Sequence, residues 1–180
     1  MRVITGSARG RRLAGPRVAG IRPASDKVKE AVFNILGVLE GLRVLDLFAG
    51  SGSLGVEALS RGAEKATFVD SSFQAIQLIE KNLERCQFSK QALVLKLKLP
   101  LELGRIGQAN IPYDIVFVDP PYDHRLVNAT LRRLVREKIL APSGIVVVEH
   151  SPREKITSDV GLTLVDERKY GQTLITFLKT

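Results

Sequence analysis

Segments with strand character and segments with helix character alternate through most of this chain, and this alternation is its most constraining feature. Short apolar runs typical of buried strands stand at 43–48, 65–70, 92–99, 113–118 and 144–149. Amphipathic runs typical of helices stand between them, at 54–61, 72–86 and 126–138. A strand, a helix and another strand in succession are the pattern of a parallel sheet covered by helices. The sequence therefore predicts an α/β fold with a mostly parallel sheet.

The two ends of the chain depart from this alternation. Two strand-like runs at 162–168 and 173–178 are separated by four residues that predict a turn, so we expect an antiparallel hairpin to complete the sheet. Residues 1–24 combine apolar pieces with Arg-Gly steps and predict a strand-and-turn arm. A helix with one apolar face follows, with Ser25 or Asp26 as its N-cap. We expect one domain of residues 25–180, preceded by the arm.

Composition restricts the classes of protein to which the chain can belong. Its 180 residues are 44% hydrophobic and 26% charged, as in an ordinary globular domain. The single cysteine, Cys86, excludes a disulfide framework and is interpreted as a core residue. With only two histidines, His124 and His150, no metal site is expected. Charge interrupts each apolar stretch before the roughly 18 residues that a membrane helix needs, so we expect a cytoplasmic protein without membrane contact.

Positive charge is concentrated at the start of the chain. The net charge is +8, and the six arginines of residues 1–25, which contain no acidic residue, contribute +6 of it. Guanidinium groups bind phosphate oxygens bidentately, and the interspersed glycines allow the backbone to approach closely. The arm therefore predicts contact with a nucleic acid, with a merely solvated tail as the alternative. The candidate contact residues are Arg9, Arg11, Arg12, Arg22 and Lys27.

A glycine-rich loop joins the strand at 43–48 to the helix at 54–61. Residues 50–55 fit the GxGxxG spacing of dinucleotide-binding loops, and Asp70 follows 20 residues after Gly50. Taken alone, this spacing favours NAD, and a tight turn without a ligand is the structural alternative. Asp46, near the carboxyl end of the strand, argues against NAD because its charge would repel a pyrophosphate.

S-Adenosylmethionine removes this conflict, since it carries an ammonium and a sulfonium charge and no phosphate. We expect Asp46 to hold the ammonium group through water. Asp70 is placed to accept hydrogen bonds from both ribose hydroxyls of an adenosine. The predicted cofactor site consists of Asp46, Phe48, Ala49, Gly50, Ser51, Gly52, Asp70 and Ser71.

The tetrapeptide Asp119, Pro120, Pro121 and Tyr122 directly follows the strand at 113–118. This position is the carboxyl edge of the predicted sheet, where open α/β folds bind ligands. Prolines lack a backbone N–H, so the segment presents carbonyls and one carboxylate as acceptors. The Asp119 carboxylate and the Pro120 carbonyl can accept both hydrogens of an exocyclic amine and align its lone pair with an incoming methyl group. Tyr122 would supply a stacking face, and a rigid turn is the alternative to this catalytic interpretation.

These motifs together resemble those of the bacterial small-subunit ribosomal RNA guanine-N2 methyltransferases. The resemblance covers nearly the whole chain and rests on residues 2–11, 22–34, 46–62, 119–122 and 170–173. It implies a Rossmann-like class I methyltransferase fold, with seven strands, helices on both faces, a C-terminal antiparallel hairpin and a basic N-terminal β-arm. It also implies S-adenosylmethionine-dependent methylation of the N2 amine of a guanine in 16S rRNA, within an assembling small ribosomal subunit. We expect a monomer.

Three other functions remain open at this stage. A DNA adenine-N6 or other amino methyltransferase would use the same chemistry at residues 119–122, because that chemistry serves any exocyclic amine. A non-catalytic RNA-binding or assembly factor could keep the same fold. An NAD-dependent oxidoreductase would require Asp46 to tolerate a neighbouring pyrophosphate.

Overall fold

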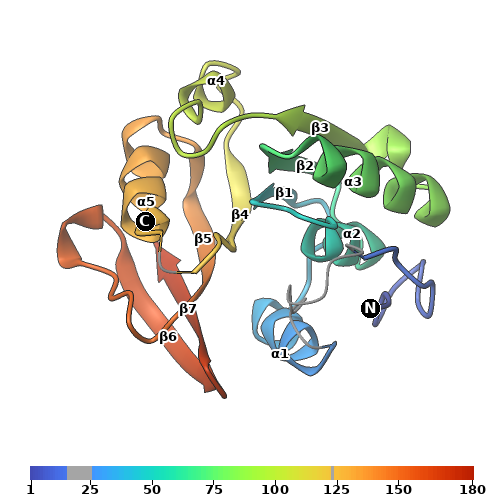
Figure 1. The fold of residues 1–180 in the computed structure, drawn as a ribbon, viewed down its shortest axis with the longest axis horizontal. Coiled ribbons are helices and arrows are strands. Elements are labelled where there is room, and N and C mark those ends of the chain that lie inside the picture. The colour runs from blue at the N-terminus through green and yellow to red at the C-terminus, as the bar shows by residue number, and fades with distance from the viewer. Residues whose placement is uncertain (16–25, 123) are drawn as a thin grey trace. The chain divides into compact units, whose positions relative to one another are not determined.

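The computed structural model describes residues 1–15, 26–122 and 124–180 of the chain. These residues form two compact units, Met1–Lys96 and Leu97–Thr180. Each unit contains strands and helices that alternate along the chain, as Figure 1 shows. The α/β alternation predicted from the sequence is thus found in both.

The first unit contains three parallel strands in the order β3-β2-β1. They are β1 (Arg43–Leu47), β2 (Lys65–Asp70) and β3 (Ala92–Lys96), and the register of the first pair runs from Arg43↔Lys65 to Leu47↔Val69. The helices of this unit are α1 (Asp26–Leu36), α2 (Ser53–Ser60), α3 (Phe73–Cys86) and the short 3-10 helix η1 (Ser89–Gln91). Strands β1 and β2 are almost entirely buried, which explains why they lack a polar alternation.

The second unit contains four strands in the order β4-β5-β7-β6. They are β4 (Tyr113–Val118), β5 (Leu140–His150), β6 (Thr163–Tyr170) and β7 (Thr173–Lys179). Strand β5 is parallel to β4 and antiparallel to β7, and β6 and β7 form the predicted hairpin, closed by the pair Tyr170↔Thr173. The helices are α4 (Gly104–Gly107), α5 (Leu126–Arg136) and the 3-10 helix η2 (Ser158–Val160).

Several element boundaries differ from those predicted. Strand β5 begins at Leu140, four residues before the predicted start, because Leu140 already pairs with Tyr113 of β4. Strand β3 ends at Lys96 and not at 99, and the connection that follows contains the short helix α4. Glycine permits this helix to lie against the C-terminal end of α5, since a Cβ at Gly107 would come within 2.7 Å of the carbonyl oxygen of Glu137, the C-cap of α5.

The first fifteen residues of the predicted arm pack within the first unit. An isolated antiparallel bridge joins Arg2 to Arg12, and Val3 donates its N–H to the Arg11 carbonyl at 3.0 Å. Val3, Ala8 and Leu13 are buried, so apolar contacts hold the turn in place. Residues 16–24 of the predicted arm, and the candidate N-cap Ser25, lie outside the described residues.

None of the helices within the described parts of the chain combines the length and apolar character required to span a membrane.

Candidate functional site

The loop between β1 and α2 makes a tight turn through three residues with positive φ. These are Phe48, Gly50 and Gly52, with φ values of 59°, 55° and 74°. Glycine adopts this region without steric cost, whereas a bulky residue such as Phe48 rarely does, so the turn is held by its surroundings. Ala49 contributes to this support by donating its N–H to the Val69 carbonyl of β2 at 3.1 Å.

Asp70 at the end of β2 binds the glycine-rich loop. Its Oδ2 accepts the Gly50 N–H at 2.9 Å, and its Oδ1 accepts the Ser72 N–H, also at 2.9 Å. Ser72 is the N-cap of α3, and the predicted neighbour Ser71 is exposed beside it. Each carboxylate oxygen retains a further lone pair, so Asp70 can still accept hydrogen bonds from hydroxyl groups.

Asp46 is buried in β1, beneath the first turn of α2. Its side chain is 1% exposed, and its Oδ2 accepts the Gly55 N–H at 2.9 Å. Burial raises the pKa of Asp46 to about 7, with the Gly55 bond opposing this rise and the charge of Asp70 adding to it. A neighbouring cation would favour the charged form of this carboxyl.

These contacts fit a cationic ligand better than a phosphate. The N-terminus of a helix attracts anions through its free N–H groups. Here the N–H groups of Gly50 and Gly55 already donate to the carboxylates of Asp70 and Asp46. A pyrophosphate would meet two acidic side chains, whereas an ammonium, a sulfonium and ribose hydroxyls would meet acceptors. The residues of the loop therefore fit S-adenosylmethionine.

Asn82 of α3 joins this loop to the N-terminal arm, a role that the sequence did not reveal. Its Oδ1 accepts the Ala14 N–H at 2.8 Å, and its Nδ2 donates to the Ala14 carbonyl at 3.0 Å. The same Nδ2 donates to the Ser51 carbonyl at 2.9 Å. The Asn82 side chain is fully buried and its partners Ala14 and Ser51 are half-buried, so these bonds are partly shielded from water.

Glu57 of α2 binds the beginning of the arm, a role that the sequence also did not reveal. Its two oxygens accept the N–H groups of Ile4 and Thr5 at 2.8 and 3.0 Å. The same carboxylate pairs with the buried Lys29 Nζ at 3.4 Å and with the Arg61 Nε at 2.9 Å. Burial lowers the pKa of Lys29, and Glu57 opposes that effect. The sequence contains one indication of a structural role for this carboxylate, since Glu57 interrupts an otherwise apolar helical run.

The candidate RNA-binding residues fall in two groups. Arg9, Arg11, Arg12 and Lys27 are exposed, and the three arginines lie within the short stretch that ends at the Arg2–Arg12 bridge. Arg11 also donates a hydrogen bond to the carbonyl of Arg85 at the end of α3. Arg22 lies outside the described residues.

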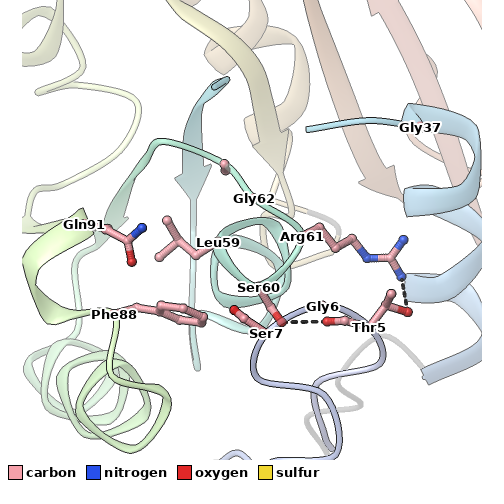
Figure 2. A pocket seen from close by; sticks show the side chains of 11 residues that line it. Thr5, Gly6, Ser7, Gly37, Leu59, Ser60, Arg61, Gly62, Phe88 and Gln91 are labelled. Carbon is pink, nitrogen blue, oxygen red and sulfur yellow. Dashed lines mark hydrogen bonds between the residues drawn. The ribbon is translucent and has the colours of Figure 1, made fainter. Parts of the chain in front are cut away.

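A pocket of about 600 Å³ lies at the opposite end of α2 from the glycine-rich loop. Figure 2 shows Ser60 and Arg61 pointing to Thr5 across it, with Ser60 Oγ donating to the Thr5 carbonyl at 2.6 Å. Its lining consists of Thr5, Gly6, Ser7, Gly37, Leu59, Ser60, Arg61, Gly62, Ala63, Phe88 and Gln91. None of the predicted site residues lines this pocket, and the polar side chains of Ser60 and Arg61 are engaged with the arm.

In the second unit, the predicted catalytic segment directly follows β4. Pro120 is buried and Pro121 is exposed, while Asp119 is half-buried. The Tyr122 hydroxyl lies 2.9 Å from Thr173 Oγ1 and donates to Glu149 Oε1 at 3.2 Å. Tyr122 remains 40% exposed, so its hydroxyl is tethered while part of its side chain is accessible.

Charge and burial keep the Tyr122 phenol protonated. Burial raises the pKa of Tyr122 to about 12, with the carboxylates of Glu149 and Asp119 adding to the rise and the Thr173 bond opposing it. Burial also raises the pKa of Glu149, which the bond from Tyr122 opposes. Glu149 is the third residue that the sequence did not assign, although the strand predicted at 144–149 ends there.

His150 and Cys86, the other residues considered from the sequence, have surroundings typical of residues with a structural role. The ring nitrogens of His150 lie within hydrogen-bond distance of the Glu154 carbonyl at 2.8 Å and of Thr176 Oγ1 at 2.8 Å. Cys86 is buried, as its interpretation as a core residue requires. Over the described residues, no group of three or more side chains suited to binding a metal occurs.

Comparison with known proteins finds close relatives along the whole chain. The model of the family described as "conserved hypothetical protein 95" matches residues 1–179. YlbH of Bacillus subtilis is 39% identical, over 99% of this chain and 98% of its own length. Ribosomal RNA small subunit methyltransferase D of Haemophilus influenzae is 33% identical, over 95% of this chain and 89% of its own length. The solved structure of yhhF from Escherichia coli has a TM-score of 0.85 and 34% identity, over 99% of this chain and 97% of that one.

The likeness in fold and sequence covers 95–99% of the chain and so extends over both units. The chain accordingly belongs to the conserved hypothetical protein 95 family and has the Rossmann-like α/β fold of class I methyltransferases.

Proposed function

We propose that this protein is an S-adenosylmethionine-dependent methyltransferase that modifies the N2 amine of a guanine in 16S rRNA. The observation that carries the proposal is the segment 119–122 after β4, whose two prolines lack an N–H donor and whose tyrosine is tethered to Thr173 and Glu149. Its occurrence in a chain 33% identical to a ribosomal RNA small subunit methyltransferase over 95% of its length supports rRNA as the substrate.

The cofactor residues in this proposal belong to the first unit. Asp46 holds the ammonium group of S-adenosylmethionine through water, and Asp70 accepts from the ribose hydroxyls. Residues 48–52 form the loop around it, and Ser71 adjoins Asp70. When bound, S-adenosylmethionine supplies an electrophilic methyl group. The occupied N–H groups of Gly50 and Gly55 support this cofactor over NAD.

The substrate residues belong to the second unit. Asp119 and the Pro120 carbonyl accept the two hydrogens of the guanine amine, so the nitrogen lone pair is free to attack. S-Adenosylmethionine would supply the methyl group to this nitrogen with its sulfur as the leaving group, and one amine proton would be released. Asp119 accepts this proton or passes it to water, and Pro121 limits the movement of the segment. Tyr122 stacks on the base, which must leave its own stack to enter the site.

The last part of the proposal concerns how the arm contacts rRNA and on which particle the protein acts. Residues 1–24 bind rRNA phosphates through Arg9, Arg11, Arg12 and Arg22, with Lys27 at the start of α1. The protein acts as a cytoplasmic monomer on an assembling small ribosomal subunit. The exposure of the three described arginines within one short stretch supports this contact.

The proposal is tested by incubating the protein with radiolabelled S-adenosylmethionine and small ribosomal subunits from cells that lack this activity. Naked rRNA and DNA are treated in parallel, and the products are digested to nucleosides. We expect label in N2-methylguanosine from 16S rRNA. Label in adenine would instead support a different amino methyltransferase. Cofactor binding without label in any substrate would support a binding or assembly factor.

A further inference from the structure

Glu149 and Asp119 each follow a residue of the same registered pair between two neighbouring parallel strands of the second unit. The Cα atoms of Val118 and Val148 are partners in the β4–β5 register. Asp119 directly follows the last residue of β4, and Glu149 is the next residue of β5, one residue before the end of that strand. Both carboxylates therefore lie at the carboxyl ends of these two parallel strands.

Tyr122 fixes the Glu149 carboxylate beside the segment that is proposed to hold the amine. The phenol donates to Glu149 Oε1 at 3.2 Å and is itself held by Thr173 at 2.9 Å. Both carboxylates, Glu149 and Asp119, also raise the pKa of this phenol. A carboxylate offers about four lone-pair positions, so Glu149 has acceptor capacity beyond its bond to Tyr122.

A second carboxylate beside the amine acceptors gives a means of distinguishing guanine from other bases. Guanine carries an N1–H donor directly beside its N2 amine. At the same place 2-aminopurine, which has the identical amine, presents an N1 lone pair, and so does adenine beside its own N6 amine. A carboxylate attracts the N1–H of guanine and repels an N1 lone pair.

We propose that Glu149 is a specificity-determining residue that accepts the N1–H of the target guanine. This inference rests on the proposed function, because it assigns a role in the same substrate site. The half-buried position of Glu149 strengthens the selection. A base that displaces water from the remaining acceptor positions of this carboxylate, without donating a hydrogen bond to them, incurs a desolvation cost. Hydrogen bonds to charged groups correspond to a preference of at least about tenfold.

The experiment compares guanine with 2-aminopurine at the methylated position of a reconstituted rRNA substrate, once that position has been mapped. For the wild-type protein we expect transfer to guanine at least about ten times faster than to 2-aminopurine. In Glu149→Gln the amide can donate to an N1 lone pair, so the preference should disappear or reverse. Affinity for S-adenosylmethionine, measured by calorimetry, should remain unchanged in that variant.

Two further variants separate selection from general damage. Glu102→Gln makes the same chemical change at a carboxylate that pairs with Arg105 in the same unit, and should keep the wild-type preference. Glu149→Asp keeps the charge on a shorter side chain, so it should lose activity on guanine without gaining activity on 2-aminopurine. This variant keeps the test informative if Glu149→Gln fails to fold.

Equal rates on the two bases in the wild-type protein would overturn the inference without affecting the proposed function. A wild-type preference that persists in Glu149→Gln would overturn it equally. Absence of transfer to any rRNA by the wild-type protein would overturn the proposed function, and the role of Glu149 with it.

Discussion

Asn82 and Ala14 exchange two hydrogen bonds, with the side-chain amide of Asn82 pairing with both backbone groups of Ala14 at 2.8 and 3.0 Å. The same amide donates to the Ser51 carbonyl of the glycine-rich loop. The loop and the N-terminal arm, which are far apart in the sequence, therefore share one buried side chain.

Asn82→Ala is expected to weaken both segments at once. Loss of three partly buried hydrogen bonds should lower the free energy of unfolding by about 1–3 kcal/mol, because backbone groups of Ala14 and Ser51 lose their partner. Affinity for S-adenosylmethionine should fall as well. Calorimetry and thermal unfolding measure the two effects, with Asn34→Ala on the exposed side of α1 as the control. Unchanged cofactor affinity in a less stable Asn82→Ala protein would show that Asn82 stabilises the arm without affecting the cofactor loop.

Asp46→Asn is expected to stabilise the free protein at neutral pH while weakening cofactor binding. Its pKa in the folded protein is about 7, against an ordinary value of 3.8. Below about pH 3 the group is neutral in both states, so the wild type and the variant should be equally stable. Between pH 4 and 7 the unfolded state ionises first, and wild-type stability falls relative to Asp46→Asn. The difference should exceed about 1 kcal/mol, or about 2–4 °C in Tm, at pH 8.

The same shift predicts how cofactor affinity depends on pH in the wild-type protein. A cationic ligand binds the charged form of Asp46, so affinity should rise as the pH increases through 7 and then level off. Titration calorimetry from pH 6 to 8 measures this trend. In Asp46→Asn the affinity should be lower and nearly independent of pH over that range. A pH-independent affinity in the wild type would contradict the proposed contact.

Gly55→Ala is expected to destabilise the first unit. An added Cβ would lie 2.3 Å from Phe68 Cε1, and Phe68 is fully buried beneath α2. Such crowding costs about 1–3 kcal/mol. The double variant Gly55→Ala with Phe68→Leu should recover part of the loss relative to the sum of the single variants, because the ring is removed. Simple additivity in thermal unfolding would show that the clash is relieved elsewhere.

Asp119→Ala is expected to reduce methyl transfer by at least about 100-fold, because one of the two amine acceptors is removed. Cofactor affinity should be retained. Single-turnover transfer and calorimetry give the two quantities. Asp166→Ala, at an exposed ion pair with Arg168 in the hairpin, serves as the control. Near-normal turnover in Asp119→Ala would refute the catalytic assignment.

Replacing Arg9, Arg11 and Arg12 together by alanine should weaken RNA binding and flatten its dependence on salt. Each lost phosphate contact makes the negative slope of log affinity against log salt concentration shallower by about 0.7–0.9. Filter binding between 50 and 200 mM salt measures the slope. Loss of affinity with an unchanged slope would show that the arginines act through the fold of the arm instead of through phosphates.

The sequence predicted those parts of the structure that depend on local patterns. The spacing of Gly50 and Asp70 predicted a shared site because parallel strands end at one edge of a sheet, and the structure joins the two residues directly. Periodicity likewise identified the strands and the hairpin. The predicted strand boundaries were wrong where strand pairing extends beyond the apolar run. Leu140, for example, belongs to β5 because it pairs with Tyr113.

Glu57, Asn82 and Glu149 escaped prediction for a common physical reason. Glu57 and Asn82 bind groups more than fifty residues away in the chain, and Glu149 is bound by a side chain 27 residues before it. No local spacing reports such contacts, because they arise only when the chain folds. Asp46 illustrates the reverse case, since the sequence identified its place but not the backbone N–H that it accepts.

The contact between Glu57 and the arm has a consequence for how this protein can diverge. Glu57 recognises the backbone N–H groups of Ile4 and Thr5, not their side chains. Every residue except proline carries such a group, so most substitutions at these two positions preserve the attachment. Exposed side chains of the arm, such as Arg9 and Arg12, can therefore be exchanged to suit a different RNA surface while the hydrogen bonds that attach the arm to Glu57 are kept.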